Sequence, residues 1–545
     1  MSWELALIAS TLLSITLVPL LMRLAPQLGL LDAPNERKVH ATPIPRVGGL
    51  AMVIAAALPI LVWAPLRAEL SAMLFAVLVL VAFGVWDDRG DLDYRLKFLG
   101  QIIATCIAIV FGGVLITRVP FFPDLTMPFW LGAPLTFFFV VGITNAINLS
   151  DGLDGLAGGT TLLILGVIVA LALAAGDEAL TISAVAIFGS ILGFLRYNSY
   201  PARVFMGDTG SQFLGFSAAV MCIVLVERSN TALSPLLPLL LLGLPILDTL
   251  SVMVQRIREG RSPFQPDKNH MHHKLMQLGF NHFEAVVVVY GVQTTLSALA
   301  FVLRYEPDAV VLLVCSIFAL VMLLAFQFAF SRDLQVVVRS DVLKAVDGRL
   351  RLWRKRQWLN LVTRIPRVFV TFALPCAFIL AAVAASSVTW DLGILAGLML
   401  CILALGTWFE PRYWAEMLQR LSLYVAAATA AYALELHPGW LKGLLLPIDA
   451  VFVFIVVGCI GMVRFSGRTS FRASPMDLLV VLLVLLIPSL PDMGLPSKQV
   501  GAIAFKFTVL CYAAEILLGR GRGTRVVLWV GAAVSLTVVC VRGLF

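Results

Sequence analysis

The stretch that decides the fold is residues 3–25, WELALIASTLLSITLVPLLMRLA, which is apolar over nearly its whole length. A helix of about 20 apolar residues crosses the hydrocarbon layer of a membrane. Runs of this kind recur along the chain, which is 60% hydrophobic and only 13% charged, whereas soluble domains are about 25% charged. Helices satisfy their own backbone hydrogen bonds in lipid. We therefore predict an all-α, polytopic transmembrane helical bundle.

Roughly eighteen runs are long enough to span, about 11 of them before residue 331 and about 7 after residue 366. No small-residue cleavage site follows the first run, so we expect an anchor and not a removed signal peptide. The remaining spans are expected to begin near residues 49, 70, 98, 131, 158, 179, 211, 234, 284, 308, 367, 391, 421, 444, 476, 500 and 526.

The distribution of basic residues predicts the orientation of these spans. If the N-terminus lies outside, most of the 40 Lys and Arg residues fall in the cytoplasmic connections, as the positive-inside rule requires. This predicts a multi-pass membrane protein whose N-terminus lies outside and whose basic connections lie in the cytoplasm. It also explains the net charge of +8 without a nucleic-acid partner. The eight cysteines include no C-x-x-C pair, so they indicate neither a disulfide framework nor a zinc site.

A strongly basic segment divides the chain. We predict a membrane domain over residues 1–330, a basic cytoplasmic linker over residues 331–366, and a C-terminal transmembrane extension over residues 367–545. The linker fits either a topological anchor on anionic headgroups or a docking site for a partner. The extension carries no recognisable motif. Stabilising a homodimer, binding a lipid product or passing it to a later enzyme all stay open for it.

Five polar loops interrupt the first part, and all five are predicted to lie on the cytoplasmic side, as one active site built from several loops would require. The first loop is residues 32–49, DAPNERKVHATPIPRVGG, where Arg37 and Lys38 beside a glycine pair suit phosphate oxygens. The second is residues 86–97, WDDRGDLDYRLK. Its adjacent Asp87 and Asp88 repel unless a cation or proton offsets them, which suits a Mg²⁺ site or a general base. Helix capping with ion pairs is the structural alternative.

The third loop is residues 145–159, NAINLSDGLDGLAGG, and the fourth is residues 198–211, NSYPARVFMGDTGS. In the third, Asn and Asp recur every third residue, which predicts one polar stripe where a span enters the cytoplasm. In the fourth, Asp208 stands between glycines at the expected start of a span, where backbone N–H groups favour phosphate or metal binding. An ordinary N-cap is the alternative for Asp208.

The fifth loop is residues 266–274, PDKNHMHHK, and holds three of the six histidines. Histidines between two lysines suit contacts to a diphosphate, since imidazole can donate or carry charge. Asp248, in the span before this loop, is a further candidate because a buried acid at that depth is by default functional.

These five loops, in this order, resemble the polyprenyl-phosphate N-acetylhexosamine-1-phosphate transferase family over about residues 1–330. The family has ten or eleven transmembrane helices and a cytoplasmic cleft open to the bilayer. The string His270-Met-His272-His273 differs from the unbroken triple histidine of the phospho-N-acetylmuramoyl-pentapeptide transferases. It looks like the branch that uses UDP-N-acetylglucosamine.

The resemblance implies a role for each matching residue. Asp208 would ligate the catalytic Mg²⁺, for which Mn²⁺ stays open as a substitute, and Asn198 would lie nearby. Asp87 would prepare the lipid phosphate for attack with support from Asp88. Asn148 and Asp151 would organise the metal and the diphosphate, with Asp151 a second metal ligand. The remaining contacts to nucleotide and sugar would come from Gly152, Leu153, Asp154, Phe205, His270, His272, His273, Arg37 and Lys38.

The implied reaction transfers N-acetylhexosamine-1-phosphate, preferably GlcNAc-1-phosphate, from a UDP-sugar to undecaprenyl phosphate in the membrane and releases UMP. The product would start a cell-envelope polysaccharide such as O-antigen, so the resemblance also implies the bacterial inner (cytoplasmic) membrane as the location. A phospho-N-acetylmuramoyl-pentapeptide transferase stays open as an alternative, and so does a transporter or flippase for a lipid-linked sugar. A transporter would concentrate polar residues near the bilayer midplane, whereas these gather at one surface. The residues fit both direct attack and a covalent aspartyl intermediate.

Overall fold

The computed structural model describes residues 2–32, 43–90, 92–262, 269–332, 358–385, 388, 390–408, 412–435, 445–465, 497–518 and 522–544. These residues form two compact units, the first ending at Arg332 and the second beginning at Trp358. Each unit is described by itself. The predicted site residues Arg37 and Lys38, most of the predicted basic linker, and the span expected to begin near residue 476 lie outside the described residues.

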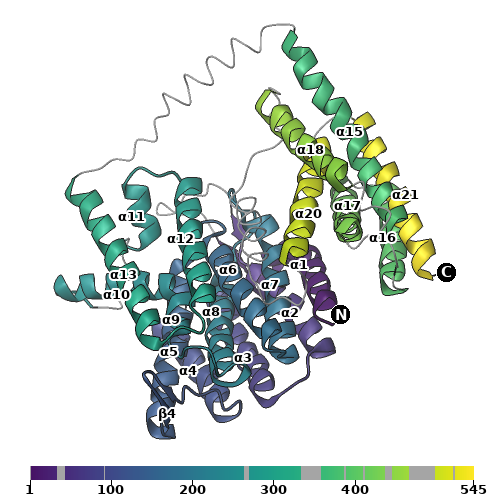
Figure 1. Cartoon of the computed structure of the whole chain (residues 1–545). Coiled ribbons are helices and arrows are strands. Elements are labelled where there is room, and N and C mark those ends of the chain that lie inside the picture. The colour runs from purple at the N-terminus through teal and green to yellow at the C-terminus, as the bar shows by residue number, and fades with distance from the viewer. Residues whose placement is uncertain are drawn as a thin grey trace. The chain divides into compact units, whose positions relative to one another are not determined.

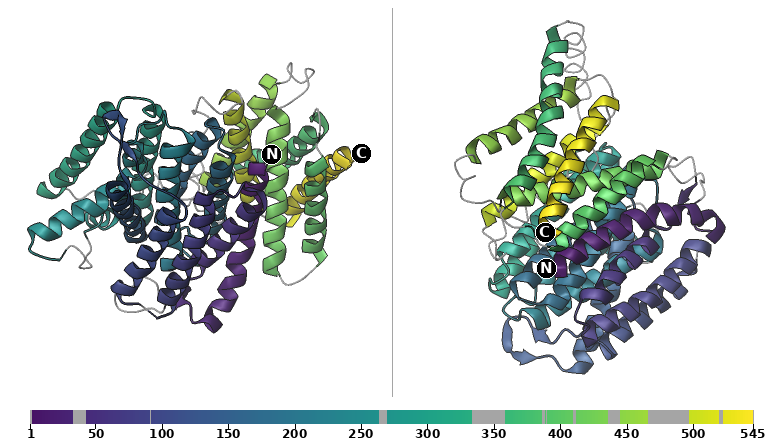
Figure 2. Two further views of the ribbon diagram at one scale, coloured as in Figure 1. Left: turned by 90° about the horizontal axis from the view of Figure 1, so that it is seen from below. Right: turned by 90° about the vertical axis from the view of Figure 1, so that its right-hand side faces the viewer.

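The first unit is a helical bundle with two short antiparallel hairpins, β1–β2 and β3–β4 (Figure 1). Its long helices run roughly side by side (Figure 2). Its elements are α1 (Ser2–Leu28), β1 (Leu31–Asp32), β2 (Ile44–Pro45), α2 (Gly48–Trp63), α3 (Ala68–Gly90), α4 (Tyr94–Val110), β3 (Arg118–Val119), β4 (Phe122–Thr126), α5 (Phe129–Ser150), α6 (Leu156–Ala174), α7 (Glu178–Asn198), α8 (Gly207–Val224), η1 (Leu225–Ser229), α9 (Leu237–Leu241), α10 (Gly243–Arg258), α11 (Met271–Gln277), α12 (His282–Val302) and α13 (Asp308–Ser331).

Helices α6, α7 and α8 form the interior of this unit. Each is apolar on all sides and buried along nearly its whole length, as a helix surrounded by other helices must be. Helix α8 packs against α2, α3, α5 and α6. By contrast, α13 has the highest hydropathy of the ten described helices that could span a membrane and is almost wholly exposed, as a helix facing lipid would be.

Ten of the described helices are long and apolar enough to cross a membrane. The two hairpins are the only strands among the described residues. The predicted all-α, multi-pass membrane fold is therefore confirmed.

The single span predicted to begin near residue 234 is wrong. Helix α9 ends at Leu241, and α10 begins at Gly243 as a separate helix. Pro238 and Pro245 lack a backbone donor, and Gly243 tolerates bent backbone, so the sequence supports a break here. Helix α10 buries one face and exposes Leu250, Val254 and Ile257 on another.

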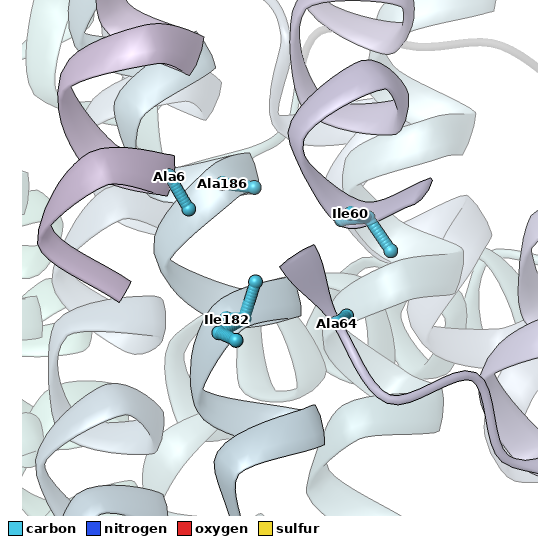
Figure 3. Packing of buried hydrophobic residues seen from close by; sticks show 5 residues of the cluster. All are labelled: Ala6, Ile60, Ala64, Ile182 and Ala186. Carbon is cyan, nitrogen blue, oxygen red and sulfur yellow. The ribbon is translucent and has the colours of Figure 1, made fainter. Parts of the chain in front are cut away.

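One end of the bundle is closed by packing and ion pairs. Ala6, Ile60, Ala64, Ile182 and Ala186 form a small buried cluster where α1, α2 and α7 meet (Figure 3). Two ion pairs lie at the same end of the bundle. Arg228 pairs with Glu69 at 2.9 Å, and Arg67 pairs with Asp177 at 3.2 Å. These contacts belong to the end opposite the polar loops, because they join the start of α3 and the start of α7.

The second unit consists of α15 (Trp358–Ala384), α16 (Trp390–Trp408), α17 (Arg412–Glu435), α18 (Leu445–Phe465), α20 (Ser497–Leu518) and α21 (Arg522–Leu544). Helices α17 and α20 are joined by Arg420, whose Nη1 lies 2.9 Å from both carboxylate oxygens of Glu515. Tyr424 also donates to Glu515. Such a pair inside apolar helices satisfies both charges locally.

Candidate active site

The predicted site loops meet at one end of the first unit. They lie at the ends of α3, α5 and α7 and at the starts of α2, α6 and α8. Since consecutive helices alternate in direction, these ends fall on the same side of the bundle. The structure therefore brings the second, third and fourth loops, and the described end of the first, into one region.

The first and fourth loops are joined backbone to backbone. The N–H groups of Gly48 and Gly49 donate to the carbonyls of Phe205 and Met206, each at 3.0 Å, and the N–H of Phe205 donates to Pro45 at 2.8 Å. A Cβ on Gly49 would lie 2.5 Å from the Cα of Gly210. The glycine pair predicted to approach a phosphate is thus used to hold the starts of α2 and α8 together.

Asp88 binds the N-terminus of α8. Its carboxylate accepts from the backbone N–H of Asp208 at 2.8 Å, the N–H of Thr209 at 3.2 Å and the hydroxyl of Thr209 at 2.7 Å. Negative charge at this point is favourable because the first N–H groups of a helix have no partner within it. Asp88 is buried, and its carboxylate holds the start of α8, which carries Asp208.

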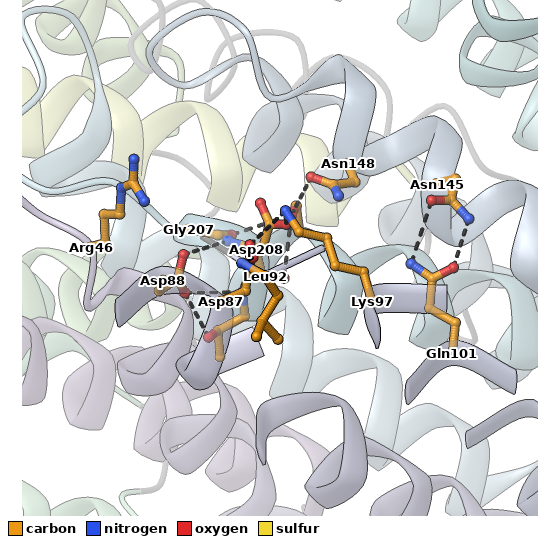
Figure 4. A network of polar contacts seen from close by, with 12 residues as sticks. Arg46, Asp87, Asp88, Leu92, Lys97, Gln101, Asn145, Asn148, Gly207 and Asp208 are labelled. Atoms are coloured by element: carbon orange, nitrogen blue, oxygen red, sulfur yellow. Dashed lines mark hydrogen bonds and ion pairs between the residues drawn. The ribbon is translucent and has the colours of Figure 1, made fainter. Parts of the chain in front are cut away.

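Asp87 and Asp208 both pair with a lysine that was not among the predicted site residues. The Nζ of Lys97, on α4, lies 2.7 Å from Oδ2 of Asp87 and 2.9 Å from Oδ2 of Asp208 (Figure 4). The backbone N–H of Leu92 also donates to Asp87 at 2.6 Å. The only sequence signal for Lys97 was its place ten residues after Asp87. A lysine in a cytoplasmic loop is otherwise expected from topology alone. Asp208 is not an N-cap, since Met206 holds that position.

The two asparagines of the predicted polar stripe contact different helices. Asn148 accepts from the hydroxyl of Ser211 on α8 at 3.0 Å, close to Asp208. Asn145 instead exchanges hydrogen bonds with Gln101 on α4 at 2.7 and 3.4 Å (Figure 4). The prediction of one polar stripe is wrong, because α5 ends at Ser150 and the two aspartates that follow lie in the loop.

The aspartates of that loop have different surroundings. Burial raises the pKa of Asp151 to about 7, with further contributions from the negative charges of Asp208, Asp154 and Asp88. Asp154 accepts from the backbone N–H of Ala202 at 2.9 Å. Leu153, one of the predicted contacts to nucleotide and sugar, is buried. The carboxylates therefore concentrate negative charge around Asp151, as a cation-binding region would.

The side chain of Asn198 forms hydrogen bonds with the backbone of two loops. It accepts from the N–H of Gly155 at 2.9 Å and donates to the carbonyl of Val204 at 2.9 Å. It is buried, so it ties the third loop to the fourth. Asn198 thus belongs to the scaffold of the site, and its place near a metal stays a prediction.

The histidine loop reaches the third loop at Gly152. A Cβ on Gly152 would lie 2.6 Å from Cε1 of His272. Burial, followed by the neighbouring His273, lowers the pKa of His272 to about 3, so this imidazole is neutral at pH 7. The rings of His272 and His273 lie 4.2 Å apart, and those of His270 and His272 lie 6.1 Å apart and nearly parallel. His272 thus lies against the acidic loop, and the rings of His270 and His273 lie beside it.

The described residues contain no group of three or more His, Cys, Asp or Glu side chains arranged to hold a metal ion. That arrangement is not required for Mg²⁺, which in proteins is commonly bound by one or two carboxylates together with substrate phosphates and water. Asp208 and Asp151 supply oxygen ligands of the right chemistry. The lysine between Asp87 and Asp208, together with the raised pKa of Asp151, marks a region that favours positive charge.

Fold and site together define a multi-pass membrane protein with a cluster of acidic side chains around Lys97 at one end of its bundle. The model of glycosyl transferase family 4 matches residues 70–226, which include Asp87, the acidic third loop and Asp208. The probable undecaprenyl-phosphate N-acetylglucosaminyl 1-phosphate transferase of Bacillus subtilis is 38% identical over 307 residues, 55% of this chain and 84% of that relative. The chain belongs to glycosyl transferase family 4.

Two further relatives have similar names. The decaprenyl-phosphate N-acetylglucosaminephosphotransferase of Mycobacterium tuberculosis is 36% identical over 333 residues, covering 53% of this chain and 79% of the relative. The undecaprenyl-phosphate alpha-N-acetylglucosaminyl 1-phosphate transferase of Escherichia coli O157:H7 is 30% identical over 340 residues, covering 60% and 90%. The resemblance stated from the motifs, to this family and to its N-acetylglucosamine branch, is confirmed.

Proposed function

We propose that this protein transfers N-acetylglucosamine-1-phosphate from UDP-N-acetylglucosamine to undecaprenyl phosphate, releasing UMP and starting a cell-envelope polysaccharide. The observation that carries the proposal is the meeting of Asp87, Asp208 and Lys97 beside the acidic loop and the histidine loop. The names of the relatives supply the acceptor and the transferred group. The UDP donor follows from the motif resemblance.

A divalent cation, Mg²⁺ or in its place Mn²⁺, fits this centre. Asp208 and Asp151 would hold it, and when bound it would screen the two phosphates and stabilise the leaving UMP. The charge on Asp151 supports this assignment, because a carboxylate crowded by three others gains most from a cation.

The protein's own residues divide the remaining work. An oxygen of the lipid phosphate bonds to the β-phosphorus of the donor as the bond from that phosphorus to the UMP oxygen breaks. Asp87 is placed to take the proton from the lipid phosphate. The ammonium of Lys97 lies between Asp87 and Asp208, where it would orient a phosphate oxygen by a charge-assisted hydrogen bond. His272, neutral and buried against Gly152, would contact the sugar or diphosphate as an uncharged group.

We place the site on the cytoplasmic face of the inner membrane. The excess of Lys and Arg in the connections on that side supports this orientation. The two substrates require it as well, because the nucleotide comes from the cytosol while the lipid arrives along the membrane.

The test is UMP release by the purified, full-length protein in detergent with UDP-N-acetylglucosamine, undecaprenyl phosphate and Mg²⁺. Release should require the lipid, stop when EDTA removes the cation, and fall at least about 100-fold in Asp208→Ala. Asp124→Ala, an exposed acid on β4, is the matched control and should act as wild type. Release from UDP-N-acetylmuramoyl-pentapeptide instead would assign the alternative transferase, and no release from any UDP-sugar by folded protein would overturn the proposal.

A further inference from the structure

Asp248 is a buried acid that the proposed reaction does not use. Its side chain, on α10, is buried. One carboxylate oxygen accepts from the backbone N–H of Met271 at 2.7 Å, and the other lies 2.9 Å from Nδ1 of His270. Both partners belong to the start of α11, which carries the histidine loop.

The sequence around Asp248 explains why it turns inward. Helix α10 exposes Leu250, Val254 and Ile257 and buries the face that includes Asp248 and Val252. Burying a carboxylate costs several kcal/mol unless it is hydrogen-bonded. The two bonds to the histidine loop offset this cost, so the acid belongs with that loop.

The geometry determines which nitrogen of His270 carries the proton. An ionised carboxylate can only accept hydrogen bonds. One oxygen is taken by a backbone N–H, so the other must receive the Nδ1–H of the ring. Nε2 then holds the lone pair, and it is the ring atom that can accept a hydrogen bond or a proton from a substrate group.

We propose that Asp248 is a positioning residue that fixes the orientation and tautomer of His270, so that Nε2 is presented to the substrate as an acceptor. The inference rests on the proposed transferase activity. The carboxylate would also stabilise positive charge on the ring if Nε2 takes a proton, which is the role of the acid in an Asp–His pair of a hydrolase triad. The bond to Met271 holds the next two histidines in line with Gly152.

The first test is a double-mutant cycle of Asp248→Asn and His270→Ala, measured as kcat and KM for UDP-N-acetylglucosamine. Asn keeps the size of Asp but offers an N–H where Nδ1 needs an acceptor. Asp248→Asn should lower kcat about 10- to 100-fold and change KM less than about threefold. In the His270→Ala background the same substitution should change kcat less than about twofold, because its effect passes through the missing ring.

Asp308→Asn is the matched control. Asp308 also accepts one side-chain and one backbone hydrogen bond, from the hydroxyl of Ser234 and the N–H of Phe121, and the variant should keep wild-type kcat. Additive effects of the two substitutions, a wild-type kcat in Asp248→Asn, or a wild-type kcat in His270→Ala would each overturn the proposal.

A second measurement separates this proposal from the proposed function. With only six histidines in the chain, solid-state NMR of ¹⁵N-histidine-labelled protein can identify the His270 signals by their loss in His270→Ala. Wild type should show an Nδ1–H tautomer that changes in Asp248→Asn. An inactive wild type with this tautomer would contradict the proposed reaction and keep the assignment of Asp248. An active wild type with an Nε2–H tautomer at His270 would support the proposed reaction and contradict the assignment of Asp248.

Discussion

At residue 152 only a hydrogen atom fits between the acidic loop and the histidine loop. A Cβ there would overlap the ring of His272, so either the ring or the start of α11 would have to shift. The first prediction concerns this contact. Gly152→Ala should lower UMP release at least about tenfold while the protein still purifies as a folded species. Gly142→Ala, on α5, meets nothing within 4 Å and should act as wild type. Equal activity of both variants would contradict a role for the contact.

The second prediction concerns Asp151 and pH. Its pKa is raised to about 7, so below that pH the proton must leave before the carboxylate can bind a cation. Affinity for Mg²⁺ should therefore increase with pH up to about 7 and fall up to about tenfold for each unit below it. The half-saturating Mg²⁺ concentration for UMP release, measured from pH 5.5 to 8, tests this. Asp151→Asn should weaken Mg²⁺ at high pH and flatten the dependence. An unchanged slope in that variant would show that another group titrates.

At the scale of the element, α8 begins with the site attached to it. Asp208 stands in its first turn, and Asp88 accepts the hydrogen bonds that hold that turn. Asp88→Asn would place an amide N–H against a donor. The third prediction is a loss of about 1–3 kcal/mol of stability, seen as a lower thermal midpoint, and at least about a tenfold loss of activity per folded protein.

Asp177→Asn is the comparison for this variant. Asp177 also binds a helix start, accepting from the N–H of Leu180 at 3.1 Å, but at the opposite end of the bundle. It should lose stability and keep its activity per folded protein. If both variants lost activity alike, the effect of Asp88 would be one of general stability and not of placing Asp208.

Elements also show where sequence reasoning failed. Hydropathy averaged over a window located the long helices, because lipid demands apolar length and little else. The same averaging hid the break between α9 and α10, where the residues on both sides are apolar but Gly243 and two prolines end one helix and start another. Asn145 and Asn148 are three residues apart on one helix, but Asn145 bonds to α4 and Asn148 bonds to α8. Spacing alone does not say which neighbour each side chain meets.

At the scale of the whole molecule, the site residues that are described all lie in the first unit. The fourth prediction is that Glu515→Gln, which breaks the contacts of Arg420 and Tyr424 in the second unit, costs about 1–3 kcal/mol of stability there and leaves UMP release within about twofold. Glu69→Gln removes the partner of Arg228 in the first unit and should reduce the yield of active protein. A large loss of activity in Glu515→Gln would show that the second unit acts on the reaction.

Much of the candidate site could be predicted because its chemistry has unusual residues at unusual places. Aspartates, glycines and clustered histidines stand out in an apolar chain, so Asp87, Asp208 and the histidines were found. Lys97 was not, because topology alone already accounts for lysines in such loops. The scaffolding roles of Asp88 and Asn198 were also missed, since a sequence does not say whether a polar group meets a ligand or a neighbouring backbone.

The backbone junction between Gly48–Gly49 and residues 205–210 has a consequence for large-scale mutagenesis. Side chains at Gly49 or Gly210 would push two helix starts apart, and with them Asp208 would leave its place. A library scored by growth would therefore rank these glycines with the aspartates, although no glycine takes part in the chemistry. Ranking by fitness alone would enlarge the apparent catalytic centre. A parallel score for protein abundance, which variants of Asp87 and Asp208 should pass and variants of Gly49 and Gly210 should fail, would restore its true size.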